Sequence, residues 1–310
     1  MTSRNTMAEV KIRNNIASVH VTLNEYDEAE TLYRLSLDLM NKYPQDTDEY
    51  HYLMEKTLSS LAGVLARQQK YHEAQIMYRQ SLDLMDKHPL DIDTDHHLMA
   101  ETLNGLASVL AHQQKHYEAE KLFLRTLEIY RKQEQEDPGE WDFVIAFQFI
   151  SLATAIQYQH RHDEANDLYN EALSILLRLV KDCSMPTDTI GMIVEGIRFI
   201  CEYLLTQNSE NNHYLADACN ELGGYYLYAK ESAPEAEFWF RKSLSIYRMV
   251  FKSDASSHTV KMMLVCGNLA KLLQNQNRDY KIDADIKETI DLYNSTYETH
   301  NEMMEELLLV

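Results

Sequence analysis

Few residues of this sequence have the types and spacings that metal binding or catalysis requires. The segment Asp91-Ile-Asp93-Thr-Asp95 places three carboxylates at alternate positions, as in the first half of a calcium-binding EF-hand loop. Its sixth position is His96 rather than glycine, and its twelfth is Thr102 rather than glutamate. We therefore expect a turn between two helices here and no calcium site.

Histidine and cysteine show no stronger pattern. The pairs His96-His97 and His160-x-His162 have no accompanying H-E-x-x-H motif or C-x-x-C pair. The sequence also lacks a glycine-rich phosphate loop and the G-x-S-x-G motif of serine hydrolases. We expect no catalytic residue, no metal and no cofactor, and hence a protein that is not an enzyme. Four separated cysteines are expected to be reduced and buried: Cys183, Cys201, Cys219 and Cys266.

Charge and composition restrict the class of partner. There are 29 Lys and Arg against 49 Asp and Glu, which gives a formal net charge of -20. This charge would repel nucleic acid and anionic membranes, whereas it suits a basic segment of another protein. The first residues lack the apolar core of a signal peptide, and no apolar run is long enough to span a membrane. We expect a cytoplasmic protein that binds a protein or peptide, as a subunit of a larger assembly.

Elements to position such a partner come from an internal repeat. An alanine in a Y/H-x-E-A context recurs at intervals of 45, 45 and 46 residues, and a second alanine lies twelve residues before each copy. Four residues after each copy comes a large aromatic residue, and three further on a small one. With only eight glycines and five prolines, this period predicts an array of helix pairs whose small residues allow close packing. The recurring alanines are Ala29, Ala74, Ala119 and Ala165, preceded by Ala17, Ala62, Ala107 and Ala153.

The pattern L-x-x-L-A followed by Y-x-E-A-x-x-x-Y-x-x-S/A-L resembles the tetratricopeptide repeat (TPR). Its best copies begin at Leu58 and Leu103, and the 45-residue period is similar to that of the kinesin-light-chain-like subgroup. The resemblance implies an all-α, right-handed superhelical solenoid of about six helix pairs. We expect one solenoid over residues 1–310, with repeats at about 7–44, 47–90, 93–137, 141–184 and 211–253, an extra helix at 187–207 without a recognisable partner, a degenerate capping repeat at 256–298 and a tail at 299–310.

The first helix of each pair should line the concave face of such an array, where partners bind. An asparagine amide there offers one acceptor and two donors, enough to hold the backbone of an extended peptide. The predicted groove residues are Asn14, Ser59, Asn104, Ile150, Asn220 and Asn268. In the fifth repeat, four aromatic residues exceed the needs of one helix pair and predict an exposed aromatic patch: Tyr225, Tyr226, Tyr228 and Trp239.

Two functions fit these features. The first is a non-catalytic scaffold or adaptor that binds a partner peptide or helix in the groove. The second is an allosteric sensor or regulator whose superhelix closes on a short peptide or small ligand, with the extra helix at 187–207 as its hinge. The identity of the partner, the pathway, the oligomeric state and any further domain in a longer protein stay open.

Overall fold

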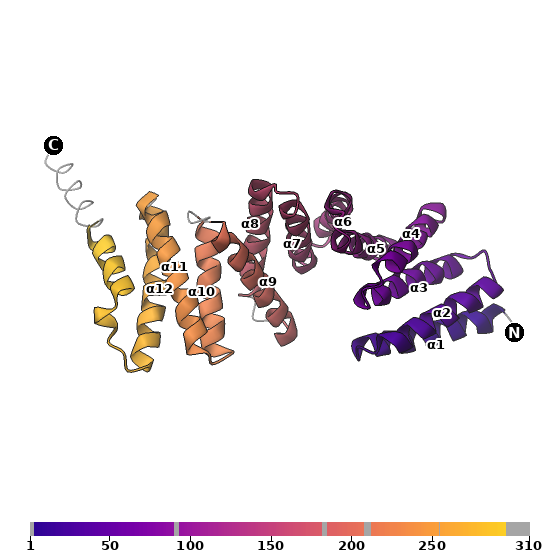
Figure 1. Cartoon of the computed structure of the whole chain (residues 1–310), viewed down its shortest axis with the longest axis horizontal. Helices are drawn as coiled ribbons and strands as arrows, with labels where there is room; N and C mark the ends of the chain where they lie inside the picture. The colour runs from indigo at the N-terminus through magenta and orange to yellow at the C-terminus, as the bar shows by residue number, and fades with distance from the viewer. Residues whose placement is uncertain (1–2, 90–92, 182–184, 208–211, 254, 296–310) are drawn as a thin grey trace. The chain divides into compact units, whose positions relative to one another are not determined.

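The computed structural model describes residues 3–89, 93–181, 185–207, 212–253 and 255–295. All regular secondary structure in these ranges is helical, which confirms the predicted all-α fold (Figure 1). The helices are α1 Ser3–Thr22, α2 Tyr26–Lys42, α3 Asp48–Arg67, α4 Tyr71–Lys87, α5 Asp93–His112, α6 His116–Glu136, α7 Asp142–Gln157, α8 His162–Leu179, α9 Thr187–Thr206, α10 His213–Tyr228, α11 Ala233–Ser253 and α12 Ala255–Asn275, with a short 3-10 helix η1 at Tyr280–Ile282. Residues 284–295 are also helical.

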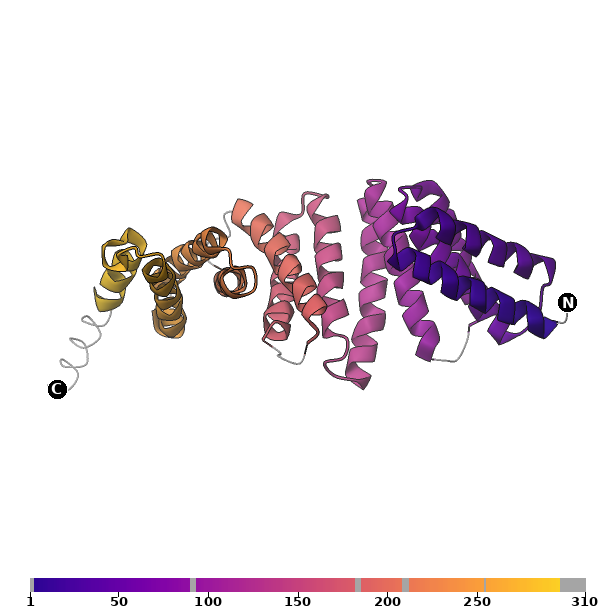
Figure 2. The same cartoon turned by 90° about the horizontal axis from the view of Figure 1, so that it is seen from below.

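The chain divides into two compact units, residues 1–165 and 166–310. In the N-terminal unit, each first helix of a pair packs on the second helix that follows it, and each second helix packs on the next first helix. Figure 2 shows α1 and α2 lying side by side in the same unit, as in Figure 1. This alternation is what a helix-pair repeat requires, because each pair buries its apolar face only against its neighbours.

The repeated alanines are the points of closest packing. All eight of them, from Ala17 to Ala165, are fully buried. The aromatic residues four positions after the alanine of the Y/H-x-E-A motif, such as Tyr33 and Tyr78, are also buried, which confirms that they belong to the core. Burial raises the pKa of Tyr78 to about 12. Large and small side chains therefore alternate along one buried stripe of each second helix.

A residue with left-handed backbone geometry joins the first and second helices of each pair. These residues have φ between 50° and 63°, and none is glycine: Asn24, Gln69, Gln114, His160, Glu231 and Asn277. At five of the six turns the next amide closes the end of the first helix by bonding to a carbonyl five residues earlier, as from Lys70 N to Leu65 O at 2.9 Å. After Glu231 the next amide, Ser232 N, bonds to Tyr226 O, which is six residues earlier.

Polar pairs between consecutive repeats add to the apolar packing. The residue after the alanine of the Y/H-x-E-A motif in one repeat meets the residue that precedes the second helix of the next repeat. Glu30 accepts from Lys70 at 2.7 Å, and Glu120 accepts two bonds from Arg161 at 2.8 and 2.9 Å. In the C-terminal unit, Arg278 donates to Glu237 at 2.6 Å. We call these contacts the inter-repeat clasps.

Helix α9, the expected extra helix, has neighbours on both sides. The ring of Tyr169 in α8 lies 4.8 Å from that of Tyr203, and α9 also packs on α10. The helix for which the sequence shows no recognisable partner therefore packs within the C-terminal unit. Cys201 of α9 and Cys219 of α10 are buried free thiols, and burial raises the pKa of Cys201. Cys266 is likewise buried, while Cys183 lies outside the described residues.

Candidate functional site

The predicted groove residues link consecutive first helices to one another. Asn14 Nδ2 in α1 donates to Thr57 Oγ1 in α3 at 2.6 Å. The hydroxyls of Ser59 in α3 and Thr102 in α5 are hydrogen-bonded at 2.9 Å. In the C-terminal unit, Asn268 Nδ2 donates to Asn220 Oδ1 at 3.1 Å. These side chains are half-buried or buried, so part of their hydrogen-bonding capacity is already used within the protein.

Two predicted residues, Asn104 and Ile150, are not part of these links between consecutive first helices. Asn104 Oδ1 is buried and has no hydrogen-bond partner among the described residues. Ile150 in α7 is half-buried and lines a pocket formed with α5.

The pocket beside Ile150 lies on two first helices of the N-terminal unit. It measures about 790 Å³ and lies between α5 and α7, with its outer end at the turns before α6 and α8. Its lining residues are Ser108, Ala111, His112, Gln114, His116, Phe123, Ile150, Ser151, Thr154, Ala155, Tyr158 and His160. None of these described lining residues is a carboxylate, although the chain as a whole carries 49 acidic residues.

The polar groups of the pocket can both accept and donate hydrogen bonds. The hydroxyls of Ser108, Ser151 and Thr154 each donate to the carbonyl four residues earlier in the same helix, at 2.9, 3.1 and 2.8 Å. The hydroxyl oxygens of Ser108 and Ser151 therefore keep lone pairs that can accept from a ligand N–H group. The apolar side chains of Phe123 and Ile150 supply the remaining wall. A mixed lining of this kind suits a peptide, whose backbone is polar and whose side chains vary.

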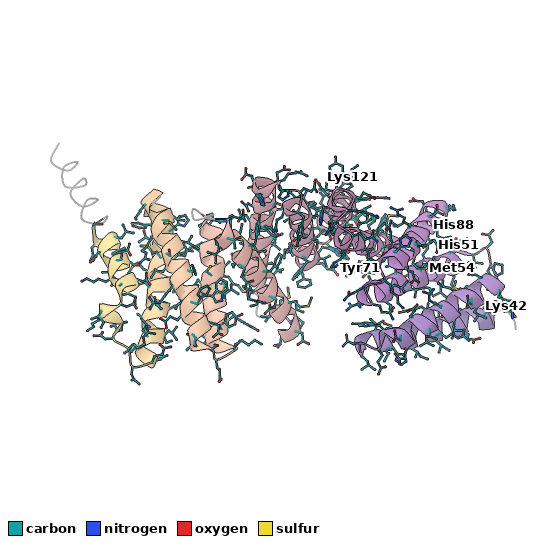
Figure 3. All side chains as sticks on the ribbon, viewed as in Figure 1. Lys42, His51, Met54, Tyr71, His88 and Lys121 are labelled. Atoms are coloured by element: carbon teal, nitrogen blue, oxygen red, sulfur yellow. The ribbon has the colours of Figure 1, made fainter. Side chains whose placement is uncertain are left out.

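Aromatic stacking holds the rings at the outer end of the pocket. The His112 ring stacks on Tyr71 with centroids 4.9 Å apart, and His116 stacks on Tyr158 at 4.7 Å. Figure 3 labels Tyr71, which begins α4. Sequence reasoning missed these rings because it considered histidines only as metal ligands. The signal was present, since His112 ends a first helix and His116 begins a second helix.

The two histidines labelled in Figure 3 stack on each other and do not form a metal site. His51 in α3 and His88, at the end of α4, have ring centroids 3.6 Å apart and an interplanar angle of 20° (Figure 3). Among the described residues, no group of three His, Cys, Asp or Glu side chains is arranged to hold a metal ion. The three-carboxylate segment that begins at Asp91 lies partly outside the described residues.

The aromatic patch predicted in the fifth repeat is only partly exposed. Trp239 is 4% exposed, so its inclusion is wrong: it packs in the core of α11 beside Phe238. Tyr225 and Tyr226 are half-buried and their rings meet edge to face, while Tyr228 is 70% exposed. The helical period explains the split, because Trp239 lies three residues after the buried Ala236 and so shares its face.

The helix pairs and their packing define a class of helical repeat protein. Residues 7–87 and 99–132 each match a family model of the tetratricopeptide repeat. The chain therefore carries tetratricopeptide repeats, as the sequence pattern predicts. Such repeats generally serve protein–protein interaction. Among the described helices, none is both long and apolar enough to cross a lipid bilayer.

Several solved structures are similar to this chain. A signal transduction ATPase with numerous domains from Pyrococcus horikoshii, which carries a tetratricopeptide repeat sensor, is 12% identical, with a TM-score of 0.53; the match covers 95% of this chain and 43% of that one. The putative kinesin light chain of Podospora anserina is 14% identical over 81% of this chain and 99% of that one, with a TM-score of 0.48. BtubC (BKLC) from P. vanneervenii is 17% identical over 88% and 92%, with a TM-score of 0.39. At these identities the likeness extends to the fold alone. The search among curated proteins found no match.

Proposed function

We propose that this protein is a non-catalytic adaptor that holds an extended peptide of a partner protein along its first helices. The observation that carries the proposal is the pocket between α5 and α7, with the hydroxyl acceptors of Ser108 and Ser151 and its apolar wall. A peptide backbone supplies N–H donors at regular intervals, so one bound strand would satisfy these acceptors.

The charge of the chain favours a partner with basic residues. A net charge of -20 attracts cations over distances of about one Debye length, roughly 8 Å at physiological salt. The pocket lining itself has no carboxylate, so the pocket would hold the backbone or an apolar side chain of the peptide. Basic residues of the partner would then meet acidic groups outside the pocket. Membership of a larger assembly in the cytoplasm fits this role.

A peptide selection tests the proposal directly. Linear peptides of random sequence are selected on the full chain, and the affinity of each enriched peptide is measured by fluorescence anisotropy. The Thr154→Arg variant places a long side chain in the pocket, and its folding is checked by circular dichroism. We expect at least a tenfold loss of affinity, because about 1.4 kcal/mol of lost contact changes a dissociation constant by that factor.

Two further variants locate the bound peptide. Gln80→Arg adds the same side chain to a different hollow, formed by α2, α3 and α4, and should leave affinity unchanged. The triple variant Asn104→Ala/Asn220→Ala/Asn268→Ala tests three of the predicted groove residues and should weaken binding less than Thr154→Arg does. Peptides that bind Thr154→Arg as tightly as the unmodified chain would place recognition elsewhere, and a selection that enriches no peptide would contradict the adaptor function.

The sensor alternative makes a different prediction. A sensor would contract when its ligand binds, which small-angle scattering measures as a smaller radius of gyration, whereas an adaptor would keep its dimensions. The cover of α9 by α8 and α10 gives no support to its use as a hinge. We therefore retain the adaptor as the proposed function.

A further inference from the structure

An apolar stripe runs along the exposed side of α1. Ile12 is 59% exposed, Ile16 45%, Val19 57% and Leu23, just beyond the helix, 60%. Spacings of four, three and four residues place all four on one face of the helix. The opposite face, with Val10 and Ala17, is fully buried against the rest of the N-terminal unit. We call these four residues the α1 stripe.

The same face is covered in every later repeat of the N-terminal unit. Residues equivalent to Ile16 in register with the repeated alanines are Leu61, Leu106 and Leu152, each at most 4% exposed. Those equivalent to Val19 are Val64, Val109 and Ala155, each at most 2% exposed. In α3 this face meets the preceding helix pair, since Thr57 bonds to Asn14 and Gln68 donates to Asp27 at 2.7 Å. The face is therefore built to pack against helices.

The α1 stripe is more apolar than the covered faces that it matches. The equivalents of Ile12 are Thr57, Thr102 and Gln148, and the equivalents of Leu23 are Gln68, Gln113 and Gln159. A terminal repeat that faces water is expected to replace apolar residues with polar ones. At both ends of the α1 stripe, apolar residues stand where later repeats have polar ones, which indicates that this face is covered by a partner.

We propose that the α1 stripe is the interface of a symmetric dimer of this chain, in which two copies of α1 pack antiparallel. The spacing of four, three and four residues is the seam at which two similar helices interlock. Antiparallel pairing places Ile16 opposite the partner's Val19, and Ile12 opposite the partner's Leu23. Each seam then fills the other, and a closed dimer results rather than an open chain of copies.

The charges beside the stripe favour a second copy over other occupants. The chain carries a net charge of -20, so copies repel each other over most of their surface. Residues 3–22 are the exception, because they contain three cations and one anion, Glu9. Glu9 is paired with Arg13 of the same helix, and His20 is bonded to Glu25. Two α1 helices can therefore approach without an unpaired like charge at the seam.

The α1 stripe is short. A 20-residue helix is about 30 Å long, so a seam between two such helices buries less area than a standard interface of about 800 Å² per partner. We therefore expect dissociation in the micromolar range.

Sedimentation velocity on the full chain tests the dimer. Samples at about 1 to 100 µM, a range that brackets micromolar dissociation, should shift from 36.2 kDa toward twice that mass as the concentration rises. The Ile16→Lys variant should stay monomeric throughout, because it places a charge in the seam opposite the partner's Val19. Its melting curve at low concentration should match that of the unmodified chain, since Ile16 is already exposed.

Ile76→Lys is the matched control, because Ile76 in α4 has a similar exposure of 42% and lies outside the stripe. It should dimerise like the unmodified chain. A chain that stays monomeric at every concentration, or an Ile16→Lys variant that dimerises normally, would overturn the proposal. Neither result bears on the peptide-binding proposal, because peptide affinity is measured on the pocket between α5 and α7.

Discussion

The first and last described helix pairs of the chain differ in how they meet their surroundings. At the N-terminal end, α1 exposes four large apolar side chains in a row. In the last described pair, charged residues take over: Arg241 of α11 bonds to Asp283 and Asp285 at 2.8 and 2.6 Å, and Arg248 bonds to Asp285 at 2.8 Å. The stripe on α1 needs a cover, whereas the last described pair, which also exposes Val260 and Leu264, adds ion pairs that tolerate water.

The comparison shows that the first and last described pairs of one repeat array can present different surfaces to their surroundings. A charged network satisfies its own groups, and in the last described pair it adds to the packing of α12 on α11. An apolar stripe gains free energy only when another surface excludes water from it. The charged end should therefore respond to charge removal and to acid, while the apolar end should respond to concentration.

Removal of Arg241 should have the largest effect on this contrast. Its side chain is 28% exposed and bonds to Glu237 as well as to the two aspartates. Arg241→Gln leaves Asp283 without a cation and removes one of the two cations of Glu237 and of Asp285, and we expect a loss of about 2 kcal/mol in the free energy of local unfolding. Hydrogen exchange followed by mass spectrometry should show faster exchange in α12 and in residues 284–295, with α1 to α4 unchanged.

Arg79→Gln is the control for this variant. Arg79 lies 3.7 Å from Glu118, and both side chains are more than half exposed, so water screens the pair. Its exchange pattern should match that of the unmodified chain. Equal exchange rates in α12 for Arg241→Gln and the unmodified chain would mean that the charged network does not hold the terminal pair.

Acid should act at the same end with a smaller effect. Hydrogen bonds from Arg241 hold the pKa of Asp283 below its usual range, and burial opposes this shift without reversing it. A carboxyl whose pKa is lowered on folding adds stability above its unfolded pKa of about 3.9, and the added stability is lost as pH falls through the folded pKa. Exchange in α12 should therefore accelerate below about pH 4, relative to exchange in α3, once intrinsic rates are corrected. The Arg241→Gln variant should lack this acid response.

Loss of one inter-repeat clasp should have the smallest effect of the three. The Glu120 side chain is 12% exposed and accepts two bonds from Arg161. Glu120→Gln removes the charge but keeps an oxygen acceptor, so we expect a loss of about 1 kcal/mol. A shift of the urea midpoint for the N-terminal unit measures it. A midpoint that moves as far as that of the C-terminal unit in Arg241→Gln would remove the distinction between a single clasp and the charged network.

The sequence alone was sufficient for the repeat and its core. The alanine period and the aromatic residue four positions later placed Tyr33 and Tyr78 in the core, because close helix packing leaves few other residue types at those positions. The exposure of Trp239 was predicted wrongly. An excess of aromatic residues says little about which helical face each one takes, whereas its spacing of three from Ala236 fixes that face.

The contacts of the candidate site were harder to predict. Hydrogen-bonded partners on consecutive first helices, such as Asn14 and Thr57, lie 43 residues apart. The inter-repeat clasps join residues that are 40 or 41 apart. Neither separation equals the 45-residue period, so alignment of the repeats does not bring the partners together. The α1 stripe was visible as a helical pattern, but its exposure follows from the absence of a preceding helix pair among the described residues, which a repeat pattern does not reveal.

The left-handed residues at the turns have a consequence for the temperature range of this protein. Gln69, Gln114 and Glu231 adopt a backbone conformation that costs a residue with a Cβ atom about 1 kcal/mol or more, and that glycine adopts freely. In a repeat array, such costs add almost independently from one repeat to the next. Glycine at these three turns should therefore raise the melting temperature in separate steps, one for each turn, while the residues that line the peptide pocket and the dimer seam keep their identities.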